Sequence, residues 1–538
     1  MESDELTQEA VTSGRTISYW IDSVKPIQYS PLAENLKTDV VIVGGGIAGI
    51  SIAYSLAMKG KKVVLVEDGF IGSGETGRTT AHLTAALDDR YFKIERLYGS
   101  KGAKLAAESH TKAIDFIEDT IKRENIDCDF KRVNGYLFLH PSDKLSNLKK
   151  EFKAAQKAGL PVEWLENVPG ITGIKSKCIQ FNNQAQFHAM KYVAGLCKAL
   201  DKMNVRIFTE THAKKIDHEG IETNDGFTVK AKHIVVATNS PVNDLFAMHT
   251  KQTANRTYAM AARIQKNSMM NALWWDTGDM DRPEVPYHYA RIQPFDETHD
   301  LLIIGGEDHT VGNTNDTHLP EEKRFEVLEK WMRKYFTFED IVYRWSGEVL
   351  EPIDGLAFSG RNPMDKPNVY IHTGDSGNGL THGTIAGMLI PDLILKKKNP
   401  WKKLYNPSRF KILHPAAAKE FIRNNFLVML EYLKDFPGTG EISKLDKLQN
   451  GHADVVQVDG EKLAVYKDEH GGMHIVSAVC THLQCVVHWN NEEKSWDCPC
   501  HGSRFTYEGK VMNGPANSDL PYRKVAGKKS VNTVNSAS

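Results

Sequence analysis

Two short segments near the end of the chain each pair a cysteine with a histidine, and both side chains can bind transition metals. The first segment carries Cys480 and His482, and the second carries Cys498 and His501. Together they offer two thiolates and two imidazoles. This donor set suits a Cys2His2 zinc site, and it also suits an iron–sulfur cluster in which the thiolates hold one iron and the histidines the other. The segments therefore predict either structural zinc or one-electron chemistry.

Further residues in the same segments favour the iron–sulfur cluster over zinc. They are Cys485 and Cys500, at matching places in the two segments, together with Pro499, Gly502 and Ser503. With these residues, the stretch from about 445 to 525 resembles the Rieske proteins of respiratory and photosynthetic cytochrome complexes. The resemblance implies a [2Fe–2S] cluster held by the two cysteines and two histidines named above.

The same resemblance implies three further features of the predicted cluster site. Cys485 and Cys500 would form a disulfide that pins the two loops together, which is unusual in the cytosol but local and shielded. Ser503 would donate a hydrogen bond to a cluster sulfur. Phe505 stands where high-potential members carry a hydrogen-bonding tyrosine, so a lower reduction potential than theirs is expected.

A second candidate site lies near the beginning of the chain, where three glycines follow an apolar strand and open a helix. They are Gly44, Gly46 and Gly49, and the next strand ends in Glu67. In this context the first glycine permits a tight turn, the second lets a pyrophosphate approach the backbone, and the third lets helix and strand pack closely. Glu67 would accept hydrogen bonds from the adenosine ribose. The pattern predicts a dinucleotide site of either the FAD or the NAD type.

Two later segments favour FAD. The segment GFIGSGETGRTTAHLTA, which contains Thr79, Thr80 and His82, is rich in small and hydroxyl side chains that could follow a pyrophosphate towards a flavin. A late glycine turn, TGDSGNGLTHG, precedes a helix whose backbone N–H groups could stabilise negative charge on a reduced flavin. The site residues predicted in this turn are Gly374, Asp375 and Gly379.

With these motifs, residues 38–400 resemble the D-amino-acid oxidase-like FAD-dependent oxidoreductases, also called the glycine oxidase or sarcosine oxidase family. The resemblance implies bound FAD and oxidation of a C–N bond in an amine or amino acid. In the dimethylglycine and sarcosine dehydrogenases of this family, a histidine after a Thr-Thr pair is linked covalently to the flavin, and Thr79-Thr80-Ala81-His82 is similar. A covalent link, a noncovalent flavin contact and a structural role all remain open for His82.

The elements that must position these residues divide the chain into several parts. Residues 1–37 suggest an irregular leader, and residues 38–415 an FAD-dependent oxidoreductase whose FAD-binding parts lie at about 38–90, 190–250 and 350–400. Alternating aromatic segments at about 130–140 and 256–349 predict a substrate-side antiparallel sheet. An amphipathic helix at 416–440 would connect to the Rieske domain at 441–538. The predicted fold is an α/β, Rossmann-like FAD-binding domain with an interleaved antiparallel β substrate domain, plus a small all-β Rieske domain.

Substrate contacts are the least determined part of the prediction. Tyr287, Tyr289 and Arg291 alternate on one strand face, where the arginine could hold a carboxylate and the tyrosines could form the pocket wall. An ordinary exposed strand face is an equally good interpretation. Trp274 and Trp275 are expected in the core.

Composition excludes several functions. The formal net charge of −1 gives no electrostatic reason to expect nucleic-acid binding. The acidic first residues lack a secretory signal, and no transmembrane segment is expected because the only apolar stretch of near-spanning length is broken by glycines. The sequence therefore predicts a cytoplasmic protein.

A flavin accepts two electrons together, whereas a Rieske cluster passes one at a time. A chain with both is expected to oxidise a small-molecule substrate and export electrons singly to a protein or quinone acceptor. The favoured hypothesis is an amine or amino-acid dehydrogenase. The alternatives are a flavoprotein dehydrogenase of another substrate, such as a hydroxy acid, and an electron-transfer reductase serving a partner protein.

Overall fold

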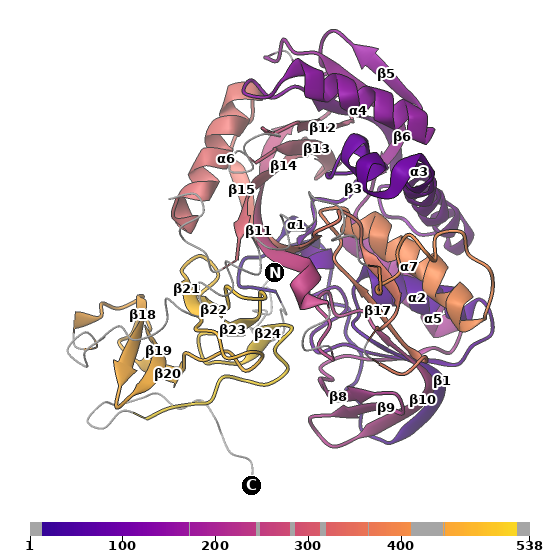
Figure 1. Cartoon of the computed structure of the whole chain (residues 1–538). Helices are drawn as coiled ribbons and strands as arrows, with labels where there is room; N and C mark the ends of the chain where they lie inside the picture. Colours follow the sequence, from indigo (N-terminus) through magenta and orange to yellow (C-terminus); the bar gives the residue numbers. More distant parts are fainter. Residues whose placement is uncertain are drawn as a thin grey trace.

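The computed structural model describes residues 13–171, 173–243, 248–279, 286–311, 319–363, 365–409, 445 and 447–524. Figure 1 shows a large lobe, built from the elements up to helix α7, and a small lobe formed by strands β18 to β24. The small lobe lies beside the end of the large lobe where strands β11 and β15 run.

The large lobe contains a first sheet whose main strands follow the order β16-β17-β10-β1-β2-β7, with β8 and β9 attached beside β10. From β17 to β7 neighbouring strands are parallel. The central strand β1 is apolar along its second half because both of its faces are covered. The strands are β1 (Leu36–Val43), β2 (Val63–Val66), β7 (Arg206–Phe208), β8 (Ala213–Asp217), β9 (Gly220–Thr223), β10 (Thr228–Val236), β16 (Phe358–Arg361) and β17 (Val369–Thr373).

Three helices cover one face of this sheet: α2 (Ile47–Ala57), α5 (Ala189–Lys202) and α7 (Gly379–Ile394). Side chains of β1 alternate between two separate cores, because successive residues of a strand point to opposite faces. Val40 and Ile42 pack in the core on the helix side, whereas Val41 and Val43 pack in the core on the other side.

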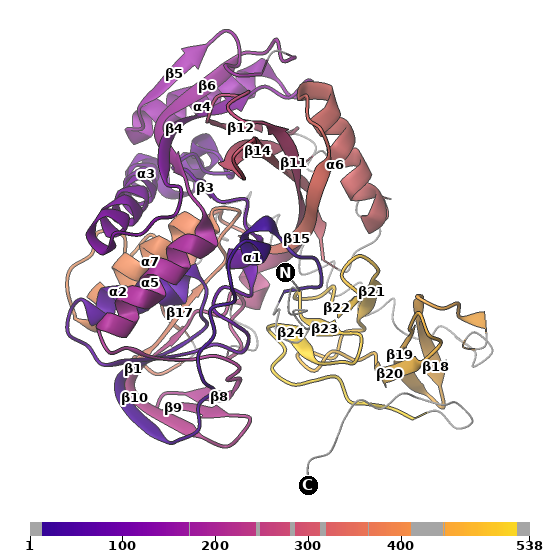
Figure 2. The same ribbon diagram turned by 180° about the vertical axis from the view of Figure 1, so that it is seen from behind.

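A second, nine-stranded sheet lies over the first (Figures 1 and 2), with the order β15-β11-β14-β13-β12-β4-β6-β3 and with β5 paired to β6. Its strands are β3 (His82–Leu83), β4 (Lys131–Phe138), β5 (Val162–Leu165), β6 (Cys178–Gln186), β11 (Gln252–Gln265), β12 (Leu273–Asp276), β13 (Tyr289–Pro294), β14 (His299–Thr310) and β15 (Ile341–Pro352). The pairing is antiparallel except between β4 and β12, which are parallel. The predicted antiparallel sheet is therefore mixed, and it extends over β3, β5 and β6.

The chain alternates between the two sheets, which confirms the predicted interleaving of the two domains. Other helices of the large lobe are α3 (Tyr91–Glu124), which is broken at Gly99, α4 (Leu145–Ala158) and α6 (Glu321–Tyr335). The predicted core positions Trp274 and Trp275 are both buried in this sheet.

The strands of the small lobe, all within residues 453–513, pair antiparallel, as predicted for a small all-β domain. One sheet has the order β18-β19-β20 and the other β21-β22-β23-β24. Its strands are β18 (Ala453–Val458), β19 (Glu461–Lys467), β20 (Met473–Ser477), β21 (His488–Asn490), β22 (Ser495–Asp497), β23 (Arg504–Thr506) and β24 (Val511–Asn513). The two cysteine and histidine segments form the loops between β20 and β21 and between β22 and β23.

The segment before β1 differs from the predicted irregular leader. It contains the short helix α1 (Tyr19–Asp22), whose aromatic residues Tyr19 and Trp20 are buried against the large lobe. The connecting helix predicted at 416–440 lies outside the described residues. Within the described ranges, no helix combines the length and apolar character needed to cross a membrane.

Candidate functional site

The glycine turn after β1 has the geometry that close packing around a phosphate requires. Gly44 has φ +107°, and a Cβ there would lie 2.4 Å from the carbonyl oxygen of Ala237. A Cβ on Gly49 would lie 1.9 Å from the carbonyl oxygen of Gly44. Gly46 is the N-cap of helix α2, and its side is open except for the Thr76 hydroxyl at 3.1 Å. The backbone at the N-terminus of helix α2 can therefore be approached closely at Gly46, as a pyrophosphate site needs.

Glu67 follows the last residue of β2, and its carboxyl faces this turn. Its two oxygens accept hydrogen bonds from the backbone N–H groups of Gly45, at 2.5 Å, and Gly69, at 3.0 Å. Burial, followed by the negative charge of Asp68, raises the pKa of the Glu67 carboxyl well above its ordinary value. The position fits a carboxyl group that meets ribose hydroxyls at the end of the second strand.

A cavity opens from this turn towards the second sheet. One wall is the 3-10 helix η2 (Glu75–Arg78) with the residues after it, a second wall is the late glycine turn, and a third is the face of strands β11 to β15. Of the predicted site residues, Thr79, Thr80, His82, Tyr287, Tyr289, Asp375 and Gly379 line it. Gly374 does not, but its φ of +75° and the close Pro352 side chain require glycine at the start of the turn.

His82 lies at the wall of this cavity with both ring nitrogens engaged. Nε2 lies 3.2 Å from the carbonyl oxygen of Ala290, and Nδ1 lies 3.2 Å from the hydroxyl of Thr80. Because the carbonyl only accepts, Nε2 carries the proton and Nδ1 accepts from the hydroxyl. Burial and the nearby positive charge of Arg291 lower the pKa of His82 to about 3, so the ring is neutral.

The two predicted tyrosines and the predicted arginine have different positions. Tyr287 donates a hydrogen bond to Asp88 at 2.8 Å, and the hydroxyl of Tyr289 lies 3.2 Å from that of Thr257. Arg291 is fully buried, is not part of the cavity wall, and donates to the carbonyl oxygens of Ala81 at 2.7 Å and Phe187 at 3.0 Å. The predicted role of Arg291 as a carboxylate anchor is wrong, because its strand face continues beyond the end of the cavity into the core.

The second candidate site is formed by the two loops of the small lobe. Cys485 and Cys500 form a disulfide, which confirms the predicted pairing and removes both sulfurs from metal binding. The thiols of Cys480 and Cys498 contact each other, and this contact lowers the pKa of Cys480 to about 7. Ser503 also donates a hydrogen bond to the Cys480 sulfur, as the resemblance implied for a hydroxyl beside the cluster.

The two histidines of these loops lie next to the cysteines. The ring centroids of His482 and His501 are 5.1 Å apart. Burial lowers the pKa of His501 to about 3, so its ring is neutral, and its buried Nδ1 has no hydrogen-bond partner among the described residues. Two thiols and two imidazoles, apart from the disulfide sulfurs, are therefore brought together by these loops, and this donor set fits a [2Fe–2S] cluster held by Cys480, His482, Cys498 and His501.

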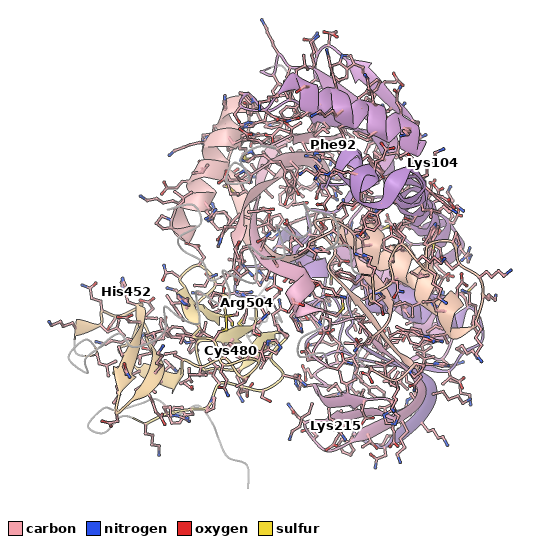
Figure 3. The ribbon with its side chains drawn as sticks, viewed as in Figure 1. Phe92, Lys104, Lys215, His452, Cys480 and Arg504 are labelled. Carbon is pink, nitrogen blue, oxygen red and sulfur yellow. A yellow bond between two sulfur atoms is a disulfide. The ribbon has the colours of Figure 1, made fainter. Side chains whose placement is uncertain are left out.

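The histidine side of this site faces the large lobe. Figure 3 shows Cys480 and Arg504 on the side of the small lobe nearer the large lobe, with His452 on the far side. The ring of His249 has its centroid 4.9 Å from that of His482 and 5.9 Å from that of His501. Gly502 is so close to strand β11 that a Cβ would lie 2.5 Å from the Cβ of Ala254.

A buried charged network joins the two lobes, and it was not predicted from the sequence. Glu493, in the turn between β21 and β22, pairs with Arg78 at 3.4 Å and with Arg256 at 2.8 Å, and all three side chains are buried. Ser346 also donates to this carboxylate. Thr16, before helix α1, donates its backbone N–H at 2.9 Å and its hydroxyl at 2.6 Å to the same group.

Comparisons with known proteins agree with both sites. Residues 39–393 match the family model of FAD dependent oxidoreductases, and residues 439–525 match that of the Rieske [2Fe–2S] domain. These two domains bind FAD and a [2Fe–2S] cluster, respectively.

Relatives of known sequence or structure extend this result. YhfW of Bacillus subtilis, named as a Rieske 2Fe-2S iron-sulfur protein, is 31% identical over 513 residues, which are 94% of this chain and 96% of that protein. Gamma-glutamylputrescine oxidoreductase of Escherichia coli is 25% identical over 70% of this chain and 89% of its own length. The crystal structure of glycine oxidase from Geobacillus kaustophilus matches 70% of this chain and 100% of its own, with 18% identity and a TM-score of 0.55, and so shares the fold. The chain therefore belongs to the FAD dependent oxidoreductases and carries a C-terminal Rieske [2Fe–2S] domain.

Proposed function

We propose that this oxidoreductase oxidises a small amine or amino acid and passes the electrons singly through the Rieske cluster to a protein or quinone acceptor. Such a reaction removes a hydride from the substrate carbon and a proton from its nitrogen, so that the C–N bond becomes a C=N bond; FAD, when bound, would supply the hydride acceptor, and water would take the proton. Bound FAD supplies two-electron chemistry and the cluster one-electron chemistry.

The observation that carries the proposal is the short path between the two candidate sites. Glu348 lines the flavin-side cavity, and its Oε2 lies 3.3 Å from the position that a Cβ of Gly502 would take. Gly502 follows the proposed ligand His501 directly. One layer of residues therefore separates the cavity from the proposed cluster, which supports electron transfer within the chain.

This chain's residues have separable roles in the proposal. The glycine turn and Glu67 bind the adenosine end of FAD, and the residues from Thr79 to His82 with the late glycine turn bind the flavin end. Cys480, His482, Cys498 and His501 hold the cluster, and His249 packs against its two histidines. The family membership supports a substrate with a C–N bond, because glycine oxidase and gamma-glutamylputrescine oxidoreductase are among the similar proteins.

The test is to remove the cluster and keep the flavin. Cys498→Ser should abolish the rhombic EPR signal of the reduced cluster. Anaerobic substrate should still bleach the flavin at nearly the wild-type rate, whereas turnover with a one-electron acceptor should collapse. Normal turnover of the cluster-free, FAD-loaded variant with one-electron acceptors would show that the cluster is not the exit route.

A further inference from the structure

The charges of the flavin-side cavity indicate what kind of substrate it accepts. Most of the charged side chains that line it are carboxylates: Glu75, Asp88, Asp308, Glu348 and Asp375. Arg78 is the only arginine or lysine in this wall among the described residues. The question is which of these charges can reach a substrate.

The two terminal nitrogens of Arg78 are not available to a substrate. Its side chain is buried, and both terminal nitrogens point into the interface between the lobes. Nη1 donates to Ser346 and pairs with Glu493, while Nη2 donates to the carbonyl oxygens of Gly14 and Thr16. A substrate carboxylate would therefore find no free terminal guanidinium nitrogen or ammonium group in the described part of the wall: only the buried Nε of Arg78 lacks a partner there, and Arg291 is used in the core.

Three of the wall carboxylates are engaged in other contacts or disfavoured in their charged form. Asp375 has its Oδ1 2.9 Å from Nε2 of His372. Glu75 accepts hydrogen bonds from the Ser13 hydroxyl and, at 2.6 Å, from the backbone N–H of Glu348. Burial and the negative charge of Glu75 raise the pKa of Glu348 well above its ordinary value, which disfavours its charged form. These contacts leave Asp88 and Asp308 as the carboxylates to consider at the substrate end.

Asp88 lies where the flavin end of the cavity meets the substrate sheet. Its carboxylate accepts a hydrogen bond from the hydroxyl of Tyr287. It also lies close to the late glycine turn, because a Cβ on Gly377 would be only 2.1 Å from Oδ2 of Asp88. Its backbone N–H donates to Asn378, the N-cap of α7, at 3.3 Å. Arg90 lies behind the ring of Tyr287, outside the cavity wall, and donates to the carbonyl oxygen of Leu87.

Asp308, on strand β14, faces the same cavity with an unused acceptor. Its Oδ1 is buried and has no hydrogen-bond partner among the described residues. The positive charge that acts on it, that of His288, is already held between Asp276 at 3.3 Å and Glu307 at 2.8 Å. A buried carboxylate oxygen without a donor is costly unless a ligand supplies one. The tyrosine rings of Tyr287 and Tyr289, 5.6 Å apart, add an aromatic wall that also favours a cation.

We propose that the substrate is a cationic amine without a carboxylate on the reacting carbon, bound through Asp88 and Asp308. This inference rests on the proposed oxidation of a C–N bond and narrows its substrate class. Amino acids are disfavoured because their carboxylate would lie against two carboxylates, with no lysine and no free terminal guanidinium nitrogen in the described wall to pair with it.

Binding without turnover gives the sharpest test. tert-Butylamine and 2-aminoisobutyrate differ by a carboxylate in place of one methyl group, and neither has a hydrogen on the carbon that bears nitrogen. Calorimetric titration of the FAD-loaded chain should show tert-butylamine binding at least tenfold more tightly. Tighter binding of 2-aminoisobutyrate, or no binding of tert-butylamine at millimolar concentration, would overturn the proposal.

Variants assign the charge preference to the residues. Asp308→Asn and, separately, Asp88→Asn should weaken tert-butylamine binding about 10- to 100-fold, the usual effect of losing one charged hydrogen bond. Glu297→Gln is the matched control, because it removes one exposed carboxylate from the β13–β14 hairpin. If both aspartate variants, with FAD still bound, bind tert-butylamine as tightly as the control does, the assignment is wrong.

Oxidation of matched substrates separates this inference from the proposed function. Pyrrolidine should bleach the flavin anaerobically faster than proline, and butylamine faster than 2-aminopentanoate, by at least tenfold. Faster reduction by the two amino acids would overturn the inference and leave C–N oxidation in place. If no amine or amino acid reduces the flavin, the proposed function fails, while the binding comparison still decides the charge preference of the cavity.

Discussion

Replacing Glu493 by glutamine should release the Rieske domain from the flavin domain without unfolding either of them. The carboxylate has no exposed surface and lies within 3.4 Å of two buried guanidinium groups, those of Arg78 and Arg256. Glutamine keeps nearly the same shape and an oxygen that can still accept from Thr16. The substitution therefore removes mainly the negative charge.

The expected magnitude follows from the burial of the network. An exposed ion pair contributes about 0–1 kcal/mol, whereas removing one partner of a buried pair costs about 3–5 kcal/mol because the remaining charge has no compensation. Here two arginines lose their shared carboxylate. Arg504 keeps its own partner, Asp497, at 3.0 Å. A loss of about 4 kcal/mol would lower the ratio of docked to undocked molecules about a thousandfold.

Hydrogen exchange measured by mass spectrometry can detect this opening locally, which is preferable to a global unfolding curve for a protein with several domains. Peptides covering residues 13–18 and the β21–β22 hairpin should exchange faster in Glu493→Gln by a factor that corresponds to about 3–5 kcal/mol. Glu461→Gln is the control, since Glu461 forms an exposed pair with Arg523 at 2.8 Å in the same domain. If the two variants exchange alike, Glu493 does not hold the lobes together.

The same contact makes docking sensitive to acid. Burial opposes the charged form of Glu493, but the positive charges of Arg78 and Arg256 outweigh it, so the pKa lies well below the ordinary value. A carboxyl with a lowered pKa stabilises the docked state above its free pKa of about 4.3, and this stabilisation is lost as pH falls. Acidification from about pH 4 downwards should therefore weaken docking of the wild type progressively, until the pH reaches the lowered pKa of docked Glu493, and the Glu493→Gln variant should lack this pH dependence.

Three further predictions concern the cofactors. Gly46→Val should give folded protein without FAD, measured as flavin absorbance per chain, because a branched side chain would block the approach of the pyrophosphate. Acid precipitation of the wild type should release its flavin, because both ring nitrogens of His82 are engaged by Ala290 and Thr80, and a yellow precipitate would contradict this. Phe505→Tyr should raise the cluster potential in an EPR-monitored titration by about 60 mV, the equivalent of one hydrogen bond of about 1.4 kcal/mol, and an unchanged potential would show that the hydroxyl does not reach the cluster.

Sequence reasoning succeeded where the residues of a site are neighbours in the chain. Gly44, Gly46 and Gly49 form one turn, so their spacing alone specifies the close packing that the structure shows. The disulfide between Cys485 and Cys500 joins residues only 15 positions apart, in loops that the family resemblance already placed together. Local geometry is encoded by local residue types, which is why these features could be predicted.

Arg291 shows how a correct local pattern can give a wrong role. Strand alternation placed it on the same face as Tyr289, but the extent of the cavity depends on β3 and on the chain around Phe187, which approach that strand from distant positions. Only the tertiary fold shows that the face passes from the cavity wall into the core. An arginine on a strand therefore indicates an anion site only when the residues that form the boundary of the cavity are known.

The contact between the lobes was beyond sequence reasoning for a related reason. Arg78 belongs to the segment that the sequence assigns to flavin binding, whereas Glu493 lies 415 residues later, in a hairpin turn whose residues carry no functional motif. Thr16, from the segment predicted to be an irregular leader, completes the network 477 residues away from Glu493. Each residue is ordinary by itself, since arginine and glutamate are usually exposed. Burial of Arg78, Arg256 and Glu493 at one point gives the cluster loops a defined position beside the flavin cavity, because buried charges tolerate few alternative arrangements in which all remain paired.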